Sequence, residues 1–102
     1  MKLNEAEKRG IKAEIVEQLR GESEVSRIII FGSFVKEKTP NDIDVAVFQT
    51  SKEPYFPLAI KYRKKLSAIA DRIPVDVIPI RPNPEKSPFL DEILAGEVVY
   101  ER

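Results

Sequence analysis

The chain contains no cysteine, no histidine and no tryptophan among its 102 residues. Without cysteine there is no disulfide framework, no thiol nucleophile and no cysteine-ligated zinc site. Without histidine, the Ser-His-Asp and Cys-His arrangements of nucleophilic catalysis are excluded, and so are histidine-ligated metals. Any side-chain chemistry must therefore rely on carboxylates, hydroxyls, lysine, arginine and a bound metal.

Neither sign of charge is in excess, because 17 Lys and Arg residues balance 17 Asp and Glu residues. A zero net charge argues against binding of a long nucleic acid, which needs a basic excess or a segregated basic patch. No apolar run is long enough to span a bilayer, and the N-terminus lacks the apolar region of a signal peptide. We therefore expect a soluble, cytoplasmic single domain over residues 1–102 without membrane association.

The spacing of apolar residues predicts alternating helices and strands. A helix is expected after Asn4, whose capping box uses Glu7, and it should stop near Gly21. Short apolar runs predict strands at 25–31, 43–48 and 75–80, and Pro79 suggests that the last lies at a sheet edge. A linker is expected at 50–57, a helix at 58–73, a helix between Ser87 and Gly96, and a tail at 98–100 that packs back on the domain. This order predicts a small α/β (α+β) sheet with helices packed on it.

Two aspartates one residue apart, Asp42 and Asp44, interrupt an apolar strand-like run. Residues two apart on a strand face the same side, roughly 7 Å apart on a rise of about 3.3 Å per residue. Paired carboxylates repel each other, so a fold keeps them mainly when a cation lies between them, and hard oxygen ligands favour Mg²⁺. Asp76 lies within the third predicted strand. Facing the Gly32-Ser33 turn, the three carboxylates indicate a site for one or two metals and a nucleoside triphosphate.

Each of these residues also has an ordinary structural explanation. Asp42 could belong to a turn after Pro40, and Asp44 could be a solvated strand-edge residue. Asp76 could form an ion pair with Arg72 or Arg81. The Gly-Ser pair could be a plain strand-to-loop turn. The sequence alone leaves these alternatives open.

Three segments, Phe31-Gly32-Ser33, Asp42-Ile43-Asp44 and Val75-Asp76-Val77, together resemble the signature of the DNA polymerase beta-like nucleotidyltransferase superfamily. The small size and the C-terminal segment 89–101 resemble its minimal nucleotidyltransferase branch, whose members pair with HEPN-domain proteins in prokaryotic toxin–antitoxin modules. The resemblance implies a polymerase beta-like fold with a mixed sheet flanked by helices. It also implies that Asp42, Asp44 and Asp76 are the catalytic residues and the ligands of a two-ion Mg²⁺ site, with Gly32 and Ser33 binding the triphosphate of ATP. The loop between Ser33 and Asp42 is shorter than is common in the family.

By resemblance, the chain is an antitoxin that transfers AMP from ATP to a hydroxyl, such as a tyrosine, on a HEPN-domain toxin. The shorter loop keeps a second hypothesis open, a binding module that neutralises its partner by docking alone. A third class, resembling aminoglycoside-modifying enzymes, normally needs an added acceptor-binding domain. We expect Phe34, Tyr55 and Phe56 to be exposed contacts for the partner. Self-association is left open.

Overall fold

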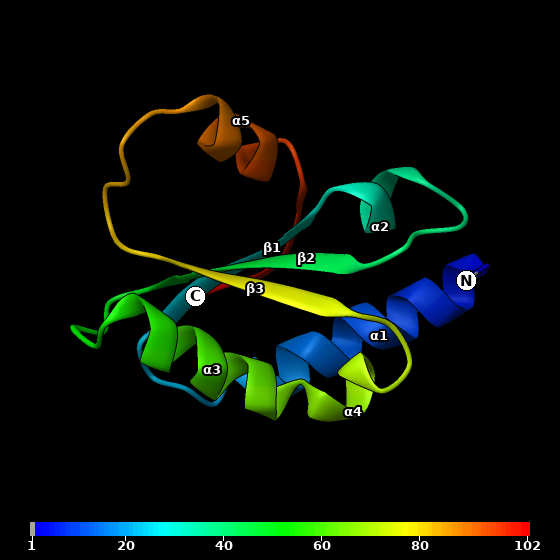
Figure 1. Cartoon of the computed structure of the whole chain (residues 1–102), viewed down its shortest axis with the longest axis horizontal. Coiled ribbons are helices and arrows are strands. Elements are labelled where there is room, and N and C mark those ends of the chain that lie inside the picture. Colours follow the sequence, from blue (N-terminus) through cyan, green and yellow to red (C-terminus); the bar gives the residue numbers. More distant parts are fainter. Residues whose placement is uncertain (1) are drawn as a thin grey trace.

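The computed structural model describes residues 2–102, which form a four-stranded sheet in the order β3-β2-β1-β4 (Figure 1). Strand β1 is antiparallel to both β2 and β4, whereas β2 and β3 are parallel, so the sheet is mixed as expected. None of the helices in this range is long and apolar enough to cross a bilayer. The elements are α1 (Glu5–Leu19), β1 (Val25–Phe31), α2 (Ser33–Lys36), β2 (Ile43–Gln49), α3 (Tyr55–Lys65), α4 (Ser67–Ala70), β3 (Val75–Ile80), α5 (Pro88–Leu94) and β4 (Glu97–Glu101).

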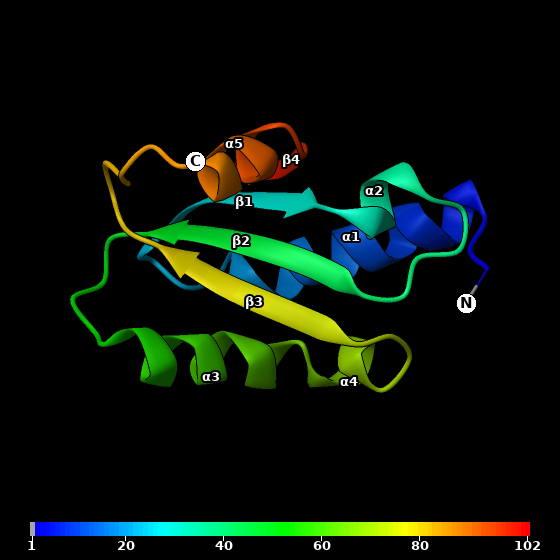
Figure 2. The same ribbon diagram turned by 45° about the horizontal axis from the view of Figure 1, so that its top comes forward.

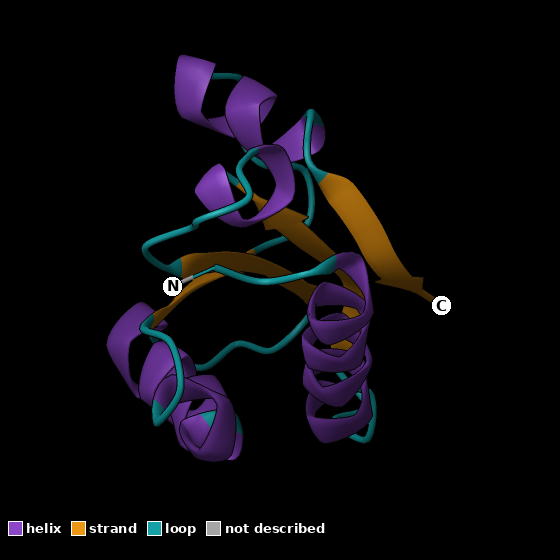
Figure 3. Ribbon diagram, turned by 90° about the vertical axis from the view of Figure 1, so that its right-hand side faces the viewer, coloured by secondary structure: helices purple, strands orange, loops and turns teal. Residues whose placement is uncertain are grey.

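Helices lie on both sides of the sheet (Figures 2 and 3). Helices α1, α3 and α4 cover one face, and the larger apolar core fills the space between them and the sheet. A smaller core lies under α5 on the opposite face, where Ile93 packs near Phe31, Ala46 and Phe48. Alternate residues of β2 pack into the two cores, because successive side chains of a strand point to opposite faces of the sheet.

Most of the predicted elements are confirmed. Strands β1 and β3 have the expected bounds, and β2 extends one residue further, to Gln49. The capping box of Asn4 and Glu7 starts α1, and the Ser87 side chain caps α5. Pro79 lies on β3, which is an edge strand. On an edge strand the missing N–H of a proline can face solvent, so no hydrogen bond to a neighbouring strand need be lost.

Three predictions about elements were wrong or incomplete. The expected linker 50–57 ends early, because α3 begins at Tyr55 and accommodates Pro57 in its first turn, where backbone N–H groups have no intrahelical partner. The expected helix 58–73 is broken at Leu66, whose φ of −101° and ψ of 15° separate α3 from α4. The C-terminal tail does pack back on the domain, but it does so as a fourth strand, β4, paired with β1.

Candidate active site

The three aspartates come together on the face of the sheet that carries α5. Asp44 and Asp76 are direct partners on the parallel strands β2 and β3, and Asp42 immediately precedes β2. Asp44 shares its face with Ala46 and Phe48, which pack under α5. The register of the sheet therefore brings together residues that are more than thirty positions apart in the chain.

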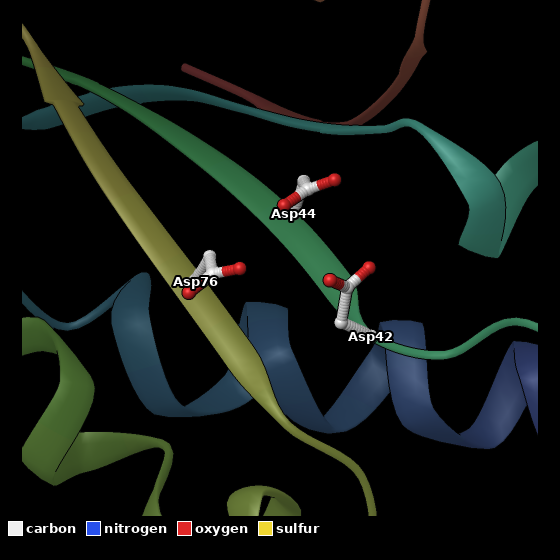
Figure 4. A group of neighbouring side chains, drawn as sticks. All are labelled: Asp42, Asp44 and Asp76. Carbon is white, nitrogen blue, oxygen red and sulfur yellow. The ribbon is translucent and has the colours of Figure 1, made fainter.

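One carboxylate oxygen from each aspartate lies within 4.8 Å of the others (Figure 4). Asp42 and Asp44 are half-buried, while Asp76 is exposed. The predicted convergence is confirmed as a spatial arrangement. Three oxygens at this separation are suited to sharing a hard divalent cation.

The local electrostatics penalise the ionised form of Asp44. Burial, reinforced by the charges of Asp42, Asp76 and Glu92, raises the pKa of Asp44 from 3.8 to about 6. Sequence reasoning missed Glu92, which is on α5, because no spacing relates it to a residue 48 positions earlier. A bound cation would offset this repulsion and lower the pKa of Asp44 again.

No ion pair within residues 2–102 neutralises the three aspartates. Arg72 pairs with Glu14, and Arg81 donates to the backbone carbonyl of Glu53, so neither forms the ion pair considered for Asp76. Uncompensated carboxylates in a polar cluster are the donor set that magnesium prefers. The residues present therefore fit a magnesium site.

Gly32 connects β1 to α2 and lies directly against Asp44. Its φ is +77° and its ψ is −152°, a region that is essentially restricted to glycine. A Cβ at this position would lie 2.5 Å from the Oδ2 of Asp44. The glycine is thus required both by the backbone turn and by the close approach of the carboxylate.

Ser33 follows Gly32 as the first residue of α2 and is half-buried. Among the side-chain hydrogen bonds of the described chain, none involves its hydroxyl. Gly32 lies against Asp44, as expected for carboxylates that face the Gly-Ser turn, but contact of residues 32 and 33 with phosphate stays a prediction.

A groove of about 560 Å³ extends from the aspartates across the β3 edge to α3. We call it the α3 groove, and its lining residues are Asp44, Tyr55, Phe56, Ala59, Ile60, Arg63, Asp76, Val77 and Ile78. Tyr55 and Phe56 are exposed as predicted, but Phe34 is fully buried in the main core and cannot contact a partner. Sequence reasoning missed the groove itself. A signal was available in Ile60, an apolar residue of α3 that lies outside the buried stripe of that helix.

The sequence profile of the family described as "Polymerase beta, Nucleotidyltransferase" matches residues 13–102. Among solved structures, the tri-AMPylated Shewanella oneidensis HEPN toxin in complex with MNT antitoxin is similar with a TM-score of 0.65 at 18% identity, covering 93% of this chain and 73% of that chain. A toxin–antitoxin structure with AMP-PNP is similar with a TM-score of 0.67 at 19% identity, covering 89% and 73%.

A CdnC:HORMA-deltaN complex from E. coli MS115-1 is similar with a TM-score of 0.53 at 21% identity, covering 85% of this chain and 38% of that chain. No curated protein matches the chain closely enough to count as a relative. At these identities the structural likeness establishes a shared polymerase beta-like fold, which confirms the fold expected from the sequence motifs.

Proposed function

The chain belongs to the polymerase beta nucleotidyltransferase family, and we propose that it transfers AMP from ATP to a hydroxyl of a HEPN-domain partner in a magnesium-dependent reaction. The observation that carries this proposal is the convergence of Asp42, Asp44 and Asp76 beside Gly32. In a toxin–antitoxin module the modification would silence the partner, and this chain would be the antitoxin.

Asp42, Asp44 and Asp76 would hold one or two magnesium ions through their clustered oxygens. Bound there, magnesium would neutralise charge on the phosphoryl group and on the attacking and leaving oxygens. The backbone N–H groups at Gly32 and Ser33 and the Ser33 hydroxyl would bind the triphosphate on the β1 side. These residues would orient the nucleotide, which is the main protein contribution to such transfers.

Asp76 has a further role in this proposal. It is the most exposed of the three carboxylates, so it can reach an incoming acceptor. Its carboxylate would accept the proton of the acceptor hydroxyl as the oxygen forms a bond to the α-phosphorus of ATP. The bond between the α-phosphorus and the bridging oxygen to the β-phosphate breaks, and pyrophosphate leaves.

The choice of partner is supported by the similar solved structures. Several are toxin–antitoxin complexes, one contains AMP-PNP, and one contains a HEPN toxin that is tri-AMPylated. Because these chains are under 20% identical to ours, they support the proposal through the shared fold.

The test uses the product of the adjoining gene, which we expect to be a HEPN-domain protein. Incubation with this chain, ATP and magnesium should add one or more AMP groups to that product, each visible as a mass step in intact-mass spectrometry. The control is the double variant Asp42→Asn with Asp44→Asn, which should leave the partner unmodified. If the partner stays unmodified with the parent chain and both forms neutralise it equally, the enzyme hypothesis is wrong, and the hypothesis of a binding module that acts by docking alone takes its place.

A further inference from the structure

We propose that the α3 groove is the docking surface for the acceptor protein. It would receive an apolar segment that carries the acceptor hydroxyl, with an acidic side chain of that segment placed opposite Arg63. This inference rests on the proposed transfer reaction, and it identifies the face of the chain from which the acceptor enters.

The first argument comes from the geometry of phosphoryl chemistry. The attacking and leaving oxygens lie roughly in line on opposite sides of the phosphorus. Gly32 lies at the end of β1, on one side of Asp44, whereas Asp76 lies on β3, on the other side. If the pyrophosphate leaves toward the Gly32 turn, the acceptor must enter from the β3 side, where the α3 groove begins.

The second argument comes from the chemistry of the groove wall. Among the six large hydrophobic residues that are exposed in the range 2–102, three lie on it, Tyr55 at 46%, Phe56 at 74% and Ile60 at 51%. Tyr55 and Phe56 also contact each other edge to face, with ring centroids 5.4 Å apart. Exposed aromatic residues grouped beside a reactive centre are typical of the anchor positions of protein interfaces.

Charge fixes the orientation of the occupant. With magnesium bound, the carboxylates of Asp44 and Asp76 would be engaged by the cation, so Arg63 is the charged side chain of the groove lining that is left to pair with the occupant. Arg63 lies on the opposite, α3 wall and forms no ion pair within residues 2–102. A segment with its hydroxyl at Asp76 and a carboxylate at Arg63 therefore matches both walls.

The experiment separates docking of the acceptor from binding of the nucleotide. Ile60→Asp places a charge on the groove wall, and Arg63→Glu reverses the proposed pairing. The matched control is Leu94→Asp, because Leu94 is 49% exposed but lies on α5, away from the groove. Calorimetry measures the affinity for magnesium with an ATP analogue that has an uncleavable α,β-bridge. Mass spectrometry measures AMP transfer to the HEPN-domain product of the adjoining gene over a range of its concentrations.

We expect Ile60→Asp and Arg63→Glu to bind the analogue like the parent while the acceptor KM rises at least about tenfold, as for an interface anchor. Leu94→Asp should behave like the parent in both measurements. Unchanged acceptor KM in the groove variants overturns the inference while leaving the transfer reaction intact. Loss of analogue affinity in those variants also overturns it, because the groove would then hold the nucleoside. Absence of transfer by the parent chain instead refutes the proposed function.

Discussion

At the scale of single residues, Gly32 determines where the Asp44 carboxylate lies. We expect Gly32→Ala to lower the free energy of unfolding by about 1 to 3 kcal/mol, because the backbone conformation favours glycine and the added Cβ collides with Asp44. Affinity for magnesium and ATP should fall as well, since the carboxylate must move.

Urea unfolding and calorimetry measure the two effects of Gly32→Ala. The control is Gly10→Ala, within the exposed part of α1, where a Cβ meets no atom within 4 Å. That change should raise stability, by about 1 kcal/mol on helix propensity, and leave nucleotide affinity unchanged. Equal effects of the two substitutions would contradict the special position of Gly32.

Asp44 provides a second prediction, for the metal-free protein. Because the pKa of Asp44 is raised to about 6 in the folded state, the folded form binds a proton more tightly than the unfolded form, and stability falls as pH rises from about 4 to 6. Asp44→Asn removes this cost. At pH 7.5 in EDTA, its free energy of unfolding should exceed that of the parent by about 1 to 2 kcal/mol, after allowance for solvent screening. The advantage should vanish near pH 3.5, and thermal melts at both pH values measure it. A variant less stable than the parent at pH 7.5 would contradict the repulsion.

The site residues illustrate what sequence can reveal at this scale. Asp44 and Asp76 were identifiable because carboxylates inside apolar strands are costly, so each interrupts a pattern that is otherwise uniform. Asp42 was identifiable because it lies two residues before Asp44. Glu92 and Arg63 were not identifiable as neighbours of the site, because charged residues on exposed helices carry no such cost. The buried position of Phe34 was also missed, since a short helix after a glycine turn gives no periodicity to read.

At the scale of elements, α3 is joined to the start of β1 through Glu24. The Glu24 carboxylate accepts hydrogen bonds from the Tyr62 hydroxyl at 2.8 Å and from the Lys61 ammonium at 3.0 Å. Burial alone would raise the pKa of Glu24, but a backbone hydrogen bond and these two donors outweigh it and lower the pKa. This polar link positions the helix that forms the wall of the α3 groove.

We therefore expect Glu24→Gln to destabilise the fold by about 1 to 2 kcal/mol at pH 7, the cost of weakening hydrogen bonds to a charged group. A lowered folded pKa means that the stabilisation is present above the unfolded value of 4.5 and is lost as pH falls through the folded value. The difference from the parent should thus disappear in acid. Urea unfolding at pH 7 and pH 3 measures it, with Glu17→Gln on exposed α1 surface as the control. A difference that persists at pH 3 would refute the electrostatic explanation.

The elements that sequence did not predict share a physical reason. Strand β4 is half-exposed and has charged residues at both ends, so its conformation depends on pairing with β1 rather than on its own pattern. The sequence pattern does not predict the break at Leu66 either, because the apolar spacing continues through it to Ile69. By contrast, α1 and α5 were predicted well because their caps are local signals.

At the scale of the whole molecule, the two faces of the sheet differ in how far helices cover them. The face covered by α1, α3 and α4 holds the larger apolar core, while the α5 face is only partly covered and carries the aspartates at its open end. In the proposed reaction, the chemistry would therefore take place on the side of the strands opposite the larger core. Magnesium and ATP bound on the open face would add to the stability of a fold whose larger core lies on the opposite face.

Linkage makes this addition measurable. A ligand that binds only the folded state stabilises it by about 2.7 kcal/mol at a hundredfold excess over its Kd. For a domain of this size that corresponds to a rise in Tm of about 10 to 20 °C. We expect ATP with magnesium to produce such a rise in thermal denaturation followed by circular dichroism, while ATP in EDTA should produce little. The Asp42→Asn with Asp44→Asn variant should lose most of it, because the cation has lost two of its three carboxylate ligands. An equal rise with and without magnesium would place nucleotide binding away from the aspartates and remove the main support for the proposed reaction.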